Sequence, residues 1–221
     1  MLKAIQVYKA YPTGQGQIDV LQGIDLEVDQ GDIVAVVGPS GVGKSTLLHI
    51  LGGLDEPSSG QVFVDGVDVF ALSDADRAHF RNQHVGFVFQ FHHLLSDFTA
   101  LENVMMPLLI AGVSQPAARG PALALLDSVG LAKRVDHLPA ELSGGEAQRV
   151  AVARALIGQP KVVLADEPSG NLDAGRSVEL HALIWDLARS RGQTFVIATH
   201  DAELSKRADR VIRMDDGRIV I

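Results

Sequence analysis

The sequence predicts an α/β fold with a mainly parallel β-sheet, and two observations carry this prediction. Apolar runs rich in Val and Ile recur at residues 33–37, 85–90, 161–166 and 194–199, and such runs are typical of strands buried on both faces. Helical patterns separate the runs, and strands that alternate with helices along a chain form parallel sheets. The length of 221 residues fits one domain with an inserted subdomain.

The first part of the chain predicts a smaller, antiparallel sheet. Residues 3–8 and 24–28 alternate between apolar and polar side chains, as half-buried strands do. The stretch 12–17, Pro-Thr-Gly-Gln-Gly-Gln, is typical of a turn, and residues 61–69 have the pattern of a hairpin of two short strands. We therefore expect an N-terminal antiparallel β-subdomain beside the parallel sheet.

A helical insertion is predicted in the middle of the chain. From about residue 91 to residue 142 the pattern turns helical and strand-like runs are lacking. We expect a single domain over residues 1–221, in which residues 1–90 and 143–221 form the core with the β-subdomain. Residues 91–142 would then form an inserted helical subdomain.

The composition excludes several classes of function. The chain has no cysteine, which excludes disulfides, thiol catalysis and cysteine-ligated metals. Its formal net charge is -8 at pH 7, so nucleic acid is not expected as a partner. No run approaches the ~18 apolar residues that a membrane-spanning helix needs, and no signal peptide is expected at the N-terminus. Any contact with a membrane is therefore expected to go through partner proteins.

The strongest motif directly follows the apolar run 33–37. It reads Gly-Pro-Ser-Gly-Val-Gly-Lys-Ser and fits the pattern G-x-x-x-x-G-K-[ST] at each fixed position. Glycines let backbone N–H groups turn toward phosphates, the lysine suits the β- and γ-phosphates, and the serine suits Mg²⁺. A glycine turn before an ordinary helix is the alternative, but the position between a predicted strand and helix favours a P-loop NTPase with a RecA-like core. The predicted nucleotide-binding residues here are Gly38, Pro39, Ser40, Gly41, Val42, Gly43, Lys44, Ser45 and Thr46.

A second motif ends the run 161–166, where Asp166 is followed by Glu167. Adjacent strand residues point to opposite faces, so the two carboxylates are expected to have different roles. Asp166 suits a Mg²⁺ site, and Glu167 is placed to polarise an attacking water. An acidic pair at a strand end is by itself usually a solvated edge, but beside a phosphate loop the pair predicts nucleotide hydrolysis.

A third motif, Leu-Ser-Gly-Gly-Glu at residues 142–146, opens a predicted helix. Ser143 and Glu146 have the spacing of a capping box, in which the two side chains satisfy free N–H groups at a helix start. The exposed N–H groups of a helix N-terminus also bind anions. Capping and nucleotide binding are compatible, so both roles stay open for Ser143, Gly144, Gly145 and Glu146.

This third motif resembles the LSGGQ signature of ATP-binding cassette transporter ATPases, and the resemblance extends over the whole chain. Gln90 matches the family's Q-loop glutamine, which contacts Mg²⁺ and senses the transmembrane partner. Residues 169–173, which end at Asp173, resemble the D-loop that reaches across a dimer. In this family two copies face each other, and each ATP lies between the phosphate loop of one copy and the signature of the other.

Two further residues enter through the same resemblance. His200 matches the switch histidine that contacts the γ-phosphate, whereas a polar strand end before a helix is the simpler alternative. Tyr11 resembles the aromatic residue that stacks on adenine, with Tyr8 as its rival. The resemblance implies ATP and Mg²⁺ as cofactors and a second copy of the chain as a partner. It implies catalysis by Glu167 and His200, Mg²⁺ contacts from Ser45, Gln90 and Asp166, and ATP contacts from Tyr11, Ser143, Gly144, Gly145, Glu146 and Asp173.

Within the family, residues 45–60, 80–109 and 164–173 are similar to the ATPases of lipoprotein-releasing systems. The cassettes of MacB-type efflux pumps and FtsE-type division proteins are similar in the first and last stretches and are the alternatives. The tract 90–104 favours the lipoprotein-releasing system. The resemblance then implies a peripheral subunit at the cytoplasmic face of the inner membrane, bound to LolC/LolE-like transmembrane subunits.

The stretch 91–109 is the predicted docking surface for those subunits, because it follows Gln90 and is rich in aromatic residues and histidines. The alternative is that its apolar side chains pack inside the helical subdomain. The side chains in question are Phe91, Leu94, Leu95 and Phe98.

Three other classes of P-loop protein fit less well. DNA-repair and chromosome-structure ATPases carry long coiled coils between the two nucleotide motifs, and translation-factor cassette proteins carry two cassettes in a longer chain. A P-loop kinase would explain neither residues 142–146 nor His200.

Overall fold

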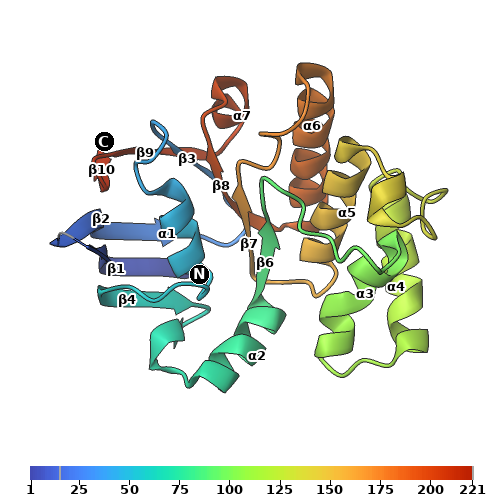
Figure 1. The fold of residues 1–221 in the computed structure, drawn as a ribbon, viewed down its shortest axis with the longest axis horizontal. Coiled ribbons are helices and arrows are strands. Elements are labelled where there is room, and N and C mark those ends of the chain that lie inside the picture. The colour runs from blue at the N-terminus through green and yellow to red at the C-terminus, as the bar shows by residue number, and fades with distance from the viewer. Residues whose placement is uncertain (15, 221) are drawn as a thin grey trace.

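The computed structural model describes residues 1–14 and 16–220, and in this part of the chain a six-stranded sheet forms the centre of the molecule (Figure 1). Its strands are β3 (Ile33–Val37), β6 (Val85–Val88), β7 (Val162–Asp166), β8 (Thr194–Thr199), β9 (Arg210–Asp215) and β10 (Arg218–Val220). The order is β10-β9-β3-β8-β7-β6; all neighbours pair in parallel except β10 and β9. The predicted mainly parallel sheet is therefore confirmed.

The central sheet is buried on both faces, which explains its continuous apolar runs. Along β8, Phe195 and Ile197 belong to one hydrophobic cluster, and Val196 and Ala198 belong to the other. The same alternation holds along β7, whose residues at 162 and 164 face the second cluster. Because the strands are parallel, the segments that leave their carboxyl ends gather at one edge of the sheet.

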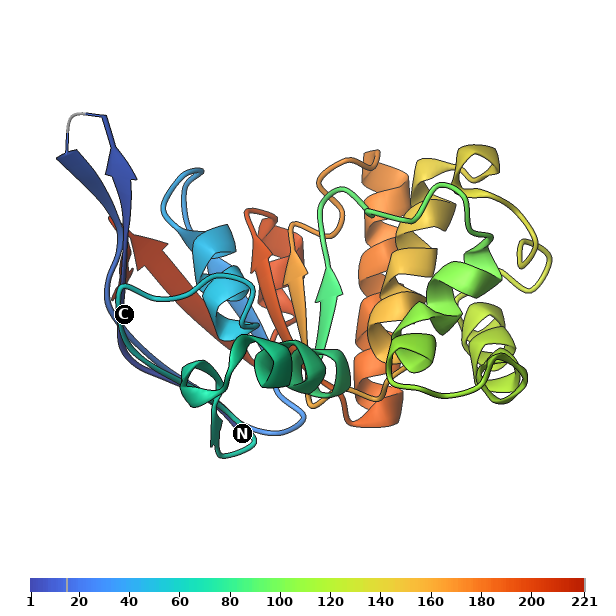
Figure 2. The same ribbon diagram turned by 60° about the horizontal axis from the view of Figure 1, so that its bottom comes forward.

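A four-stranded antiparallel sheet lies beside the central sheet (Figure 2). It consists of β1 (Leu2–Thr13), β2 (Gly16–Val28), β4 (Ser59–Val64) and β5 (Val67–Asp68), in the order β2-β1-β4-β5. The helix α1 (Lys44–Leu51) lies between the two sheets and packs on β2, β7 and β8. The predicted N-terminal antiparallel sheet is present.

Two details of this sheet differ from the prediction. β1 and β2 extend well beyond residues 3–8 and 24–28, because register shifts along their pairing interrupt the strict alternation that marked the strands. The turn is shorter than the predicted residues 12–17, because the strands extend into it: Pro12 pairs with Gln17, and Thr13 pairs with Gly16. Gln15, at the middle of that turn, lies outside the described residues.

The remaining helices pack on the central sheet or on one another. They are α2 (Asp74–His84), α3 (Ala100–Ile110), α4 (Gln115–Ser128), α5 (Gly144–Leu156), α6 (Ala174–Arg191) and α7 (Ala202–Lys206), with 3-10 turns at Val69–Ala71 and Pro139–Glu141. The sequence pattern does not predict α2. That helix is predominantly polar and buries none of its residues, so it has no apolar stripe to reveal it.

Helices α3 and α4 lie within residues 91–142, where the helical insertion is predicted. α5 packs on α3 and α4 as well as on β6. One hydrophobic cluster continues from α3 and α4 through α5 and α6 to the central sheet, so the boundary at residue 142 stays a prediction. Across the described residues, no helix has the length and apolar character needed to span a bilayer.

Candidate functional site

The phosphate loop, residues 38–45, follows β3 and ends in the first two residues of α1. Gly41 and Gly43 have φ values of 81° and 102°, in the left-handed region that favours glycine. A side chain at Gly38 would collide with the backbone carbonyl oxygen of Met214. The path of the backbone therefore favours glycine at these three positions.

The helix that follows the loop begins without a capping side chain. Gly43 is the N-cap of α1, and no acidic residue lies in the first turn. The first N–H groups of a helix have no partner inside the helix and carry partial positive charge. An uncapped helix start after a glycine-rich loop suits the binding of a phosphate.

Lys44 lies inside this loop. The residue is buried, and its Nζ donates to the carbonyl oxygens of Gly38 at 2.9 Å and Pro39 at 3.1 Å. The same Nζ lies 3.9 Å from Oε1 of Glu167. The structure therefore brings the lysine of the first motif and the second acid of the second motif together at the carboxyl edge of the sheet.

Asp166 lies on the α1 side of β7. Burial raises the pKa of Asp166, and a hydrogen bond from the Ser45 hydroxyl acts in the opposite direction. Its Oδ1 is buried and has no hydrogen-bond partner among the described residues. An unpaired carboxylate oxygen beside a serine hydroxyl is a hard oxygen donor set of the kind that Mg²⁺ takes, so these residues fit the predicted ion.

Glu167 and His200 form a pair at the ends of β7 and β8. His200 Nδ1 lies 2.9 Å from Glu167 Oε2. The Glu167 side chain is mostly buried, whereas the His200 side chain is 72% exposed. Glu167 has a φ of 45°, which costs free energy for a residue other than glycine and persists only where the surroundings hold it. Its N–H donates to the carbonyl oxygen of Ala198 at 2.9 Å.

Gln90 follows β6 and contacts the D-loop-like segment 169–173. Its Nε2 donates to Asn171 Oδ1 at 3.3 Å, and Asn171 Nδ2 donates to the Gln90 carbonyl oxygen at 3.0 Å. At the end of the segment, Asp173 caps α6 by accepting from the Arg176 N–H at 3.0 Å. The contact of Gln90 with Mg²⁺ and the contact of Asp173 across a dimer stay predictions.

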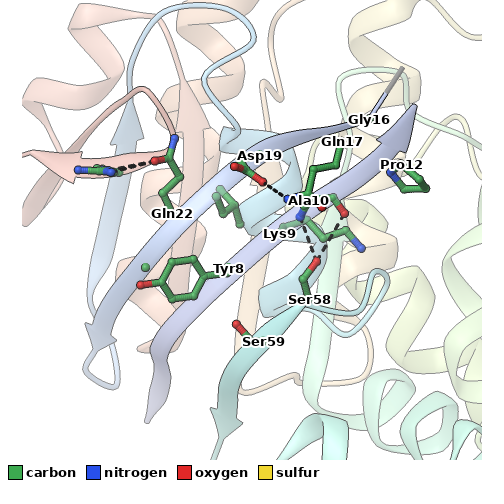
Figure 3. Close-up of a pocket in the computed structure, with 13 residues that line it drawn as sticks. Tyr8, Lys9, Ala10, Pro12, Gly16, Gln17, Asp19, Gln22, Ser58 and Ser59 are labelled. Atoms are coloured by element: carbon green, nitrogen blue, oxygen red, sulfur yellow. Dashed lines mark hydrogen bonds between the residues drawn. The ribbon is translucent and has the colours of Figure 1, made fainter. Parts of the chain in front are cut away.

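Tyr11 and Tyr8 lie in different surroundings in the structure. The Tyr11 hydroxyl donates to Asp55 and also hydrogen-bonds to Thr46 in the first turn of α1, so Tyr11 lies toward the phosphate loop. Burial and the Asp55 hydrogen bond raise the pKa of Tyr11. Tyr8 instead lines a cavity of about 920 Å³ on the strands β1 and β2, together with Gln22 (Figure 3). None of the residues 38–46 lines that cavity.

The capping interpretation of the third motif is confirmed. Ser143 Oγ accepts from the Glu146 N–H at 3.3 Å, and Glu146 Oε2 accepts from the Ser143 N–H at 2.8 Å. The backbone N–H of Ser143 and the side chain of Arg134 lower the pKa of Glu146 to about 2. Ser143, Gly145 and Glu146 also line a cavity of about 310 Å³, so the helix start is both capped and open to a ligand.

The signature and the phosphate loop lie on different sides of the central sheet. α1 packs with the cluster on one face, and α5 packs with the cluster on the other, as the two views of the ribbon also show (Figures 1 and 2). Within one chain, the structure therefore assembles residues 38–46 with Asp166, Glu167 and His200, while the signature at α5 forms a separate half of the predicted site.

Replacing Ser143 with alanine is expected to affect both stability and turnover. Loss of the cap costs about 0.5–2 kcal/mol of folding free energy. If the signature also binds ATP, turnover per folded molecule falls at least roughly tenfold. The measurements are the melting temperature and the ATPase rate of the purified variant.

The matched control is Ser73→Ala, because Ser73 caps α2 by accepting from the Asp76 N–H. It should lose similar stability and keep its turnover. A Ser143 variant with a lowered melting temperature and normal turnover would restrict the third motif to capping.

Some residues support the candidate site through long-range contacts that the sequence does not predict. Lys9 lies 2.6 Å from Asp55 and 4.7 Å from the centre of the Tyr11 ring, so both residues fix that tyrosine. His181 on α6 contacts Ser169 in the D-loop-like segment. A histidine between the apolar residues Leu180 and Leu183 is a weak signal, and its partner could not be read from the sequence.

A glycine loop around a buried lysine, beside an unpaired aspartate oxygen and a glutamate–histidine pair, defines a P-loop ATPase. A family model described as ABC transporter matches residues 21–170, which is more than half of the chain. The chain belongs to the ABC transporter family, and its enzymatic class is ATPase.

Relatives and solved structures agree with this assignment. The lipoprotein-releasing system ATP-binding protein LolD of Geobacter metallireducens is 56% identical over 220 residues, covering 100% of this chain and 98% of the relative. LolD of Bacteroides fragilis is 57% identical over 205 residues, covering 93% and 95%. The dimeric structure of MJ0796, a bacterial ABC transporter cassette, has a TM-score of 0.92 at 38% identity and covers 100% of this chain and 97% of that chain. The predicted fold class is confirmed.

A second structure of the same cassette is described as a dimeric post-hydrolysis state bound to ADP and Pi. It has a TM-score of 0.92 at 37% identity and covers 100% of this chain and 97% of that chain. The predicted class of nucleotide is thus confirmed for the family, whereas the predicted Mg²⁺ stays a proposal.

Proposed function

We propose that the chain is the ATP-hydrolysing subunit of a lipoprotein-releasing transporter. The observation that carries this proposal is the similarity, at 56% and 57% identity over nearly the full lengths, to two proteins named for lipoprotein release. The subunit would bind peripherally to the cytoplasmic face of the inner membrane through LolC/LolE-like transmembrane subunits. MacB-type efflux and FtsE-type complexes share much of the sequence pattern and are the alternative.

The proposed mechanism begins with the binding of ATP. Tyr11 would stack on the adenine, and the N–H groups of residues 40–46 would surround the β- and γ-phosphates. Lys44 would exchange its carbonyl partners for phosphate oxygens. Ser45, Gln90 and Asp166 would hold Mg²⁺, which neutralises charge on the phosphates when it is bound.

Hydrolysis would depend on Glu167 and His200. Glu167 would accept a proton from the water that attacks the γ-phosphate, because its carboxylate lies between Lys44 and His200. The imidazole of His200 is exposed and within hydrogen-bonding distance of that carboxylate, so it would position the γ-phosphate relative to the base. In this class of reaction, catalysis is mainly positioning and electrostatic stabilisation.

A second copy of the chain would complete the site. The signature lies on the other side of the sheet from the phosphate loop in the same chain, so a facing copy would supply Ser143, Gly144, Gly145 and Glu146. Asp173 would contact the facing copy through the D-loop-like segment. The dimeric structures of the similar cassette support this arrangement.

The proposed docking surface consists of the exposed residues Phe91, His93, Leu95, Asp97 and Phe98. Phe91 is 64% exposed, which supports a role outside the core. The alternative of internal packing holds for Leu94, which packs against the buried cluster. Exposed aromatic residues that are held rigidly are typical anchors of protein interfaces.

Arg154 holds this surface in place. Its guanidinium donates to the backbone carbonyl oxygens of His93 and His92, each at 2.8 Å. The His93 ring packs edge-on against Phe89 at 5.3 Å between ring centres. Beside it, Phe87, Phe89, Pro107 and Ile110 line a groove of about 400 Å³. A rigid apolar surface next to Gln90 would let a membrane partner sense the nucleotide site.

The docking proposal is tested by the double variant His93→Glu with Asp97→Lys. Both side chains are exposed, so the isolated variant should fold and hydrolyse ATP at the normal rate. It should lose its association with inner-membrane vesicles that contain the partner subunits, and a reconstituted complex should stop releasing lipoproteins.

The matched control is Asp29→Lys with Gln30→Glu. These exposed residues lie at the opposite, amino-terminal end of the parallel strands, and the formal net charge changes by the same single unit. The control should bind vesicles and release lipoproteins normally. Full association by the first variant would place the docking surface elsewhere; an intact complex that moves other substrates but never lipoproteins would favour the efflux or division alternatives.

A further inference from the structure

His181 is a buried residue of α6 to which the proposed mechanism assigns no role. It is 5% exposed and lies beside the buried residues Leu180 and Ile184. Its Nε2 lies 2.7 Å from Ser169 Oγ, and its Nδ1 lies 3.9 Å from Asp201 Oδ2. A polar ring in an apolar setting costs free energy unless its polar contacts are kept, so these two contacts define what the residue does.

The two contacts of His181 are with residues in the loops that carry Glu167 and His200. Ser169 is two residues after Glu167, and Asp201 directly follows His200. Glu167 and His200 are themselves in contact at the surface of the site. His181 therefore bridges the backbone segments that carry the proposed base and the proposed switch histidine.

The turn that contains Glu167 needs such support. The Gly170 N–H donates to the Glu167 carbonyl oxygen at 2.9 Å, and the Leu172 N–H donates to the Ser169 carbonyl oxygen at 3.0 Å. Glu167 has the left-handed φ of 45° within this turn. A strained residue keeps its conformation only where neighbouring contacts over-determine it, and the contact of Ser169 with His181 is one of them.

The protonation of His181 suits a structural link. Burial lowers the pKa of His181; the charge of Asp201 raises it, and the charge of Arg207 lowers it. In the neutral ring, Asp201 favours the proton on Nδ1, which leaves Nε2 to accept from the Ser169 hydroxyl. The 3.9 Å separation from Asp201 is longer than a hydrogen bond. The ring is therefore held to Ser169 by a hydrogen bond and to Asp201 by the attraction between its N–H dipole and the carboxylate, and the three side chains do not form the hydrogen-bonded chain that would activate Ser169 as a nucleophile.

We propose that His181 is a positioning residue for ATP hydrolysis, which fixes the turn of Glu167 relative to the loop of His200. The inference rests on the proposed roles of those two residues. Without the ring, the turn and the loop move independently, and the carboxylate spends less time in line with the attacking water. Nucleotide binding is unaffected, because His181 contacts neither the phosphate loop nor Tyr11 among the described interactions.

The test compares kcat and KM for ATP in a set of variants. His181→Leu removes both polar contacts and is expected to lower kcat by roughly 3- to 10-fold with KM unchanged, the effect of one hydrogen bond. His181→Gln should retain most of the activity, because its terminal amide reaches the place of Nε2 and preserves the bond to Ser169. Ser169→Ala should lose as much as His181→Leu, and the double variant should lose no more than either.

Gln193→Leu separates positioning from stability. Gln193 is also buried, and its Nε2 donates to the Pro160 carbonyl oxygen at 2.9 Å, at the other end of β8. This control should lower the melting temperature as much as His181→Leu and leave kcat unchanged. If His181→Leu does not fold, the comparison of His181→Gln, Ser169→Ala and their double variant carries the test.

Two results would overturn the inference. One is a normal kcat in both His181→Leu and Ser169→Ala; the other is an equal loss of kcat in Gln193→Leu. Glu167→Gln is assayed in parallel. If Glu167→Gln hydrolyses ATP normally, the proposed site itself is wrong, whereas an inactive Glu167→Gln beside a normal His181→Leu rejects the positioning role alone.

Discussion

Glutamine in place of Glu167 is expected to lower ATP hydrolysis by roughly 10²–10⁴-fold and to leave ATP binding intact. The substitution keeps the shape of the side chain and removes the group that would accept the proton of the attacking water. The left-handed φ at this position is the same for both side chains, so the strain of the turn does not change. The contacts of the phosphate loop are also preserved, which is why binding should survive.

The measurements are the steady-state ATPase rate and the ATP affinity by calorimetry. Glu27→Gln is the matched control, because Glu27 is an exposed glutamate on β2, away from the described site. It should retain full activity. A Glu167 variant with more than roughly a tenth of the normal rate would remove this residue from the role of general base.

Alanine in place of Lys44 is expected to weaken ATP binding by roughly 10- to 100-fold, the range for hydrogen bonds to charged groups. The ammonium group lies inside the loop and donates to two backbone carbonyl oxygens. Residues 38–45 contain no other lysine that could replace it. Its loss leaves the phosphate charge without its point-charge partner. Hydrolysis falls with binding, because the γ-phosphate is no longer held.

Calorimetry with ATP measures this effect directly. Lys161→Ala is the control, since Lys161 is half-exposed and pairs with Asp65 at the amino end of β7. Unchanged affinity in Lys44→Ala would reject the loop at residues 38–45 as the nucleotide site. A loss of affinity in both variants would point to a general effect of charge instead.

The central strands and the local motifs could be predicted from the sequence because their signals are local. β3, β7 and β8 are buried on both faces, which leaves continuous apolar runs. In the motif at residues 38–45, the backbone favours glycine at positions 38, 41 and 43, so the sequence displays the constraint directly. The capping box at Ser143 depends on a spacing of three residues, which the sequence displays directly.

The parts that could not be predicted depend on contacts between distant segments. The position of Tyr11 toward the phosphate loop depends on its contacts with Asp55 and Thr46, which lie far along the chain. The full length of β1 was hidden by register shifts that break the alternation of its side chains. The bridge of His181 to Ser169 and Asp201 joins three elements that meet only in the folded chain.

The most direct test of the shared ATP site is the mass of the Glu167→Gln variant in solution, measured by light scattering with and without ATP. If two copies enclose ATP between the phosphate loop of one and the signature of the other, a variant that binds ATP but cannot hydrolyse it accumulates as a dimer. At saturating ATP we predict twice the 23.6 kDa of one chain, and the addition of Ser143→Ala should prevent this increase. A variant that binds ATP by calorimetry and stays at the mass of one chain would contradict the shared site.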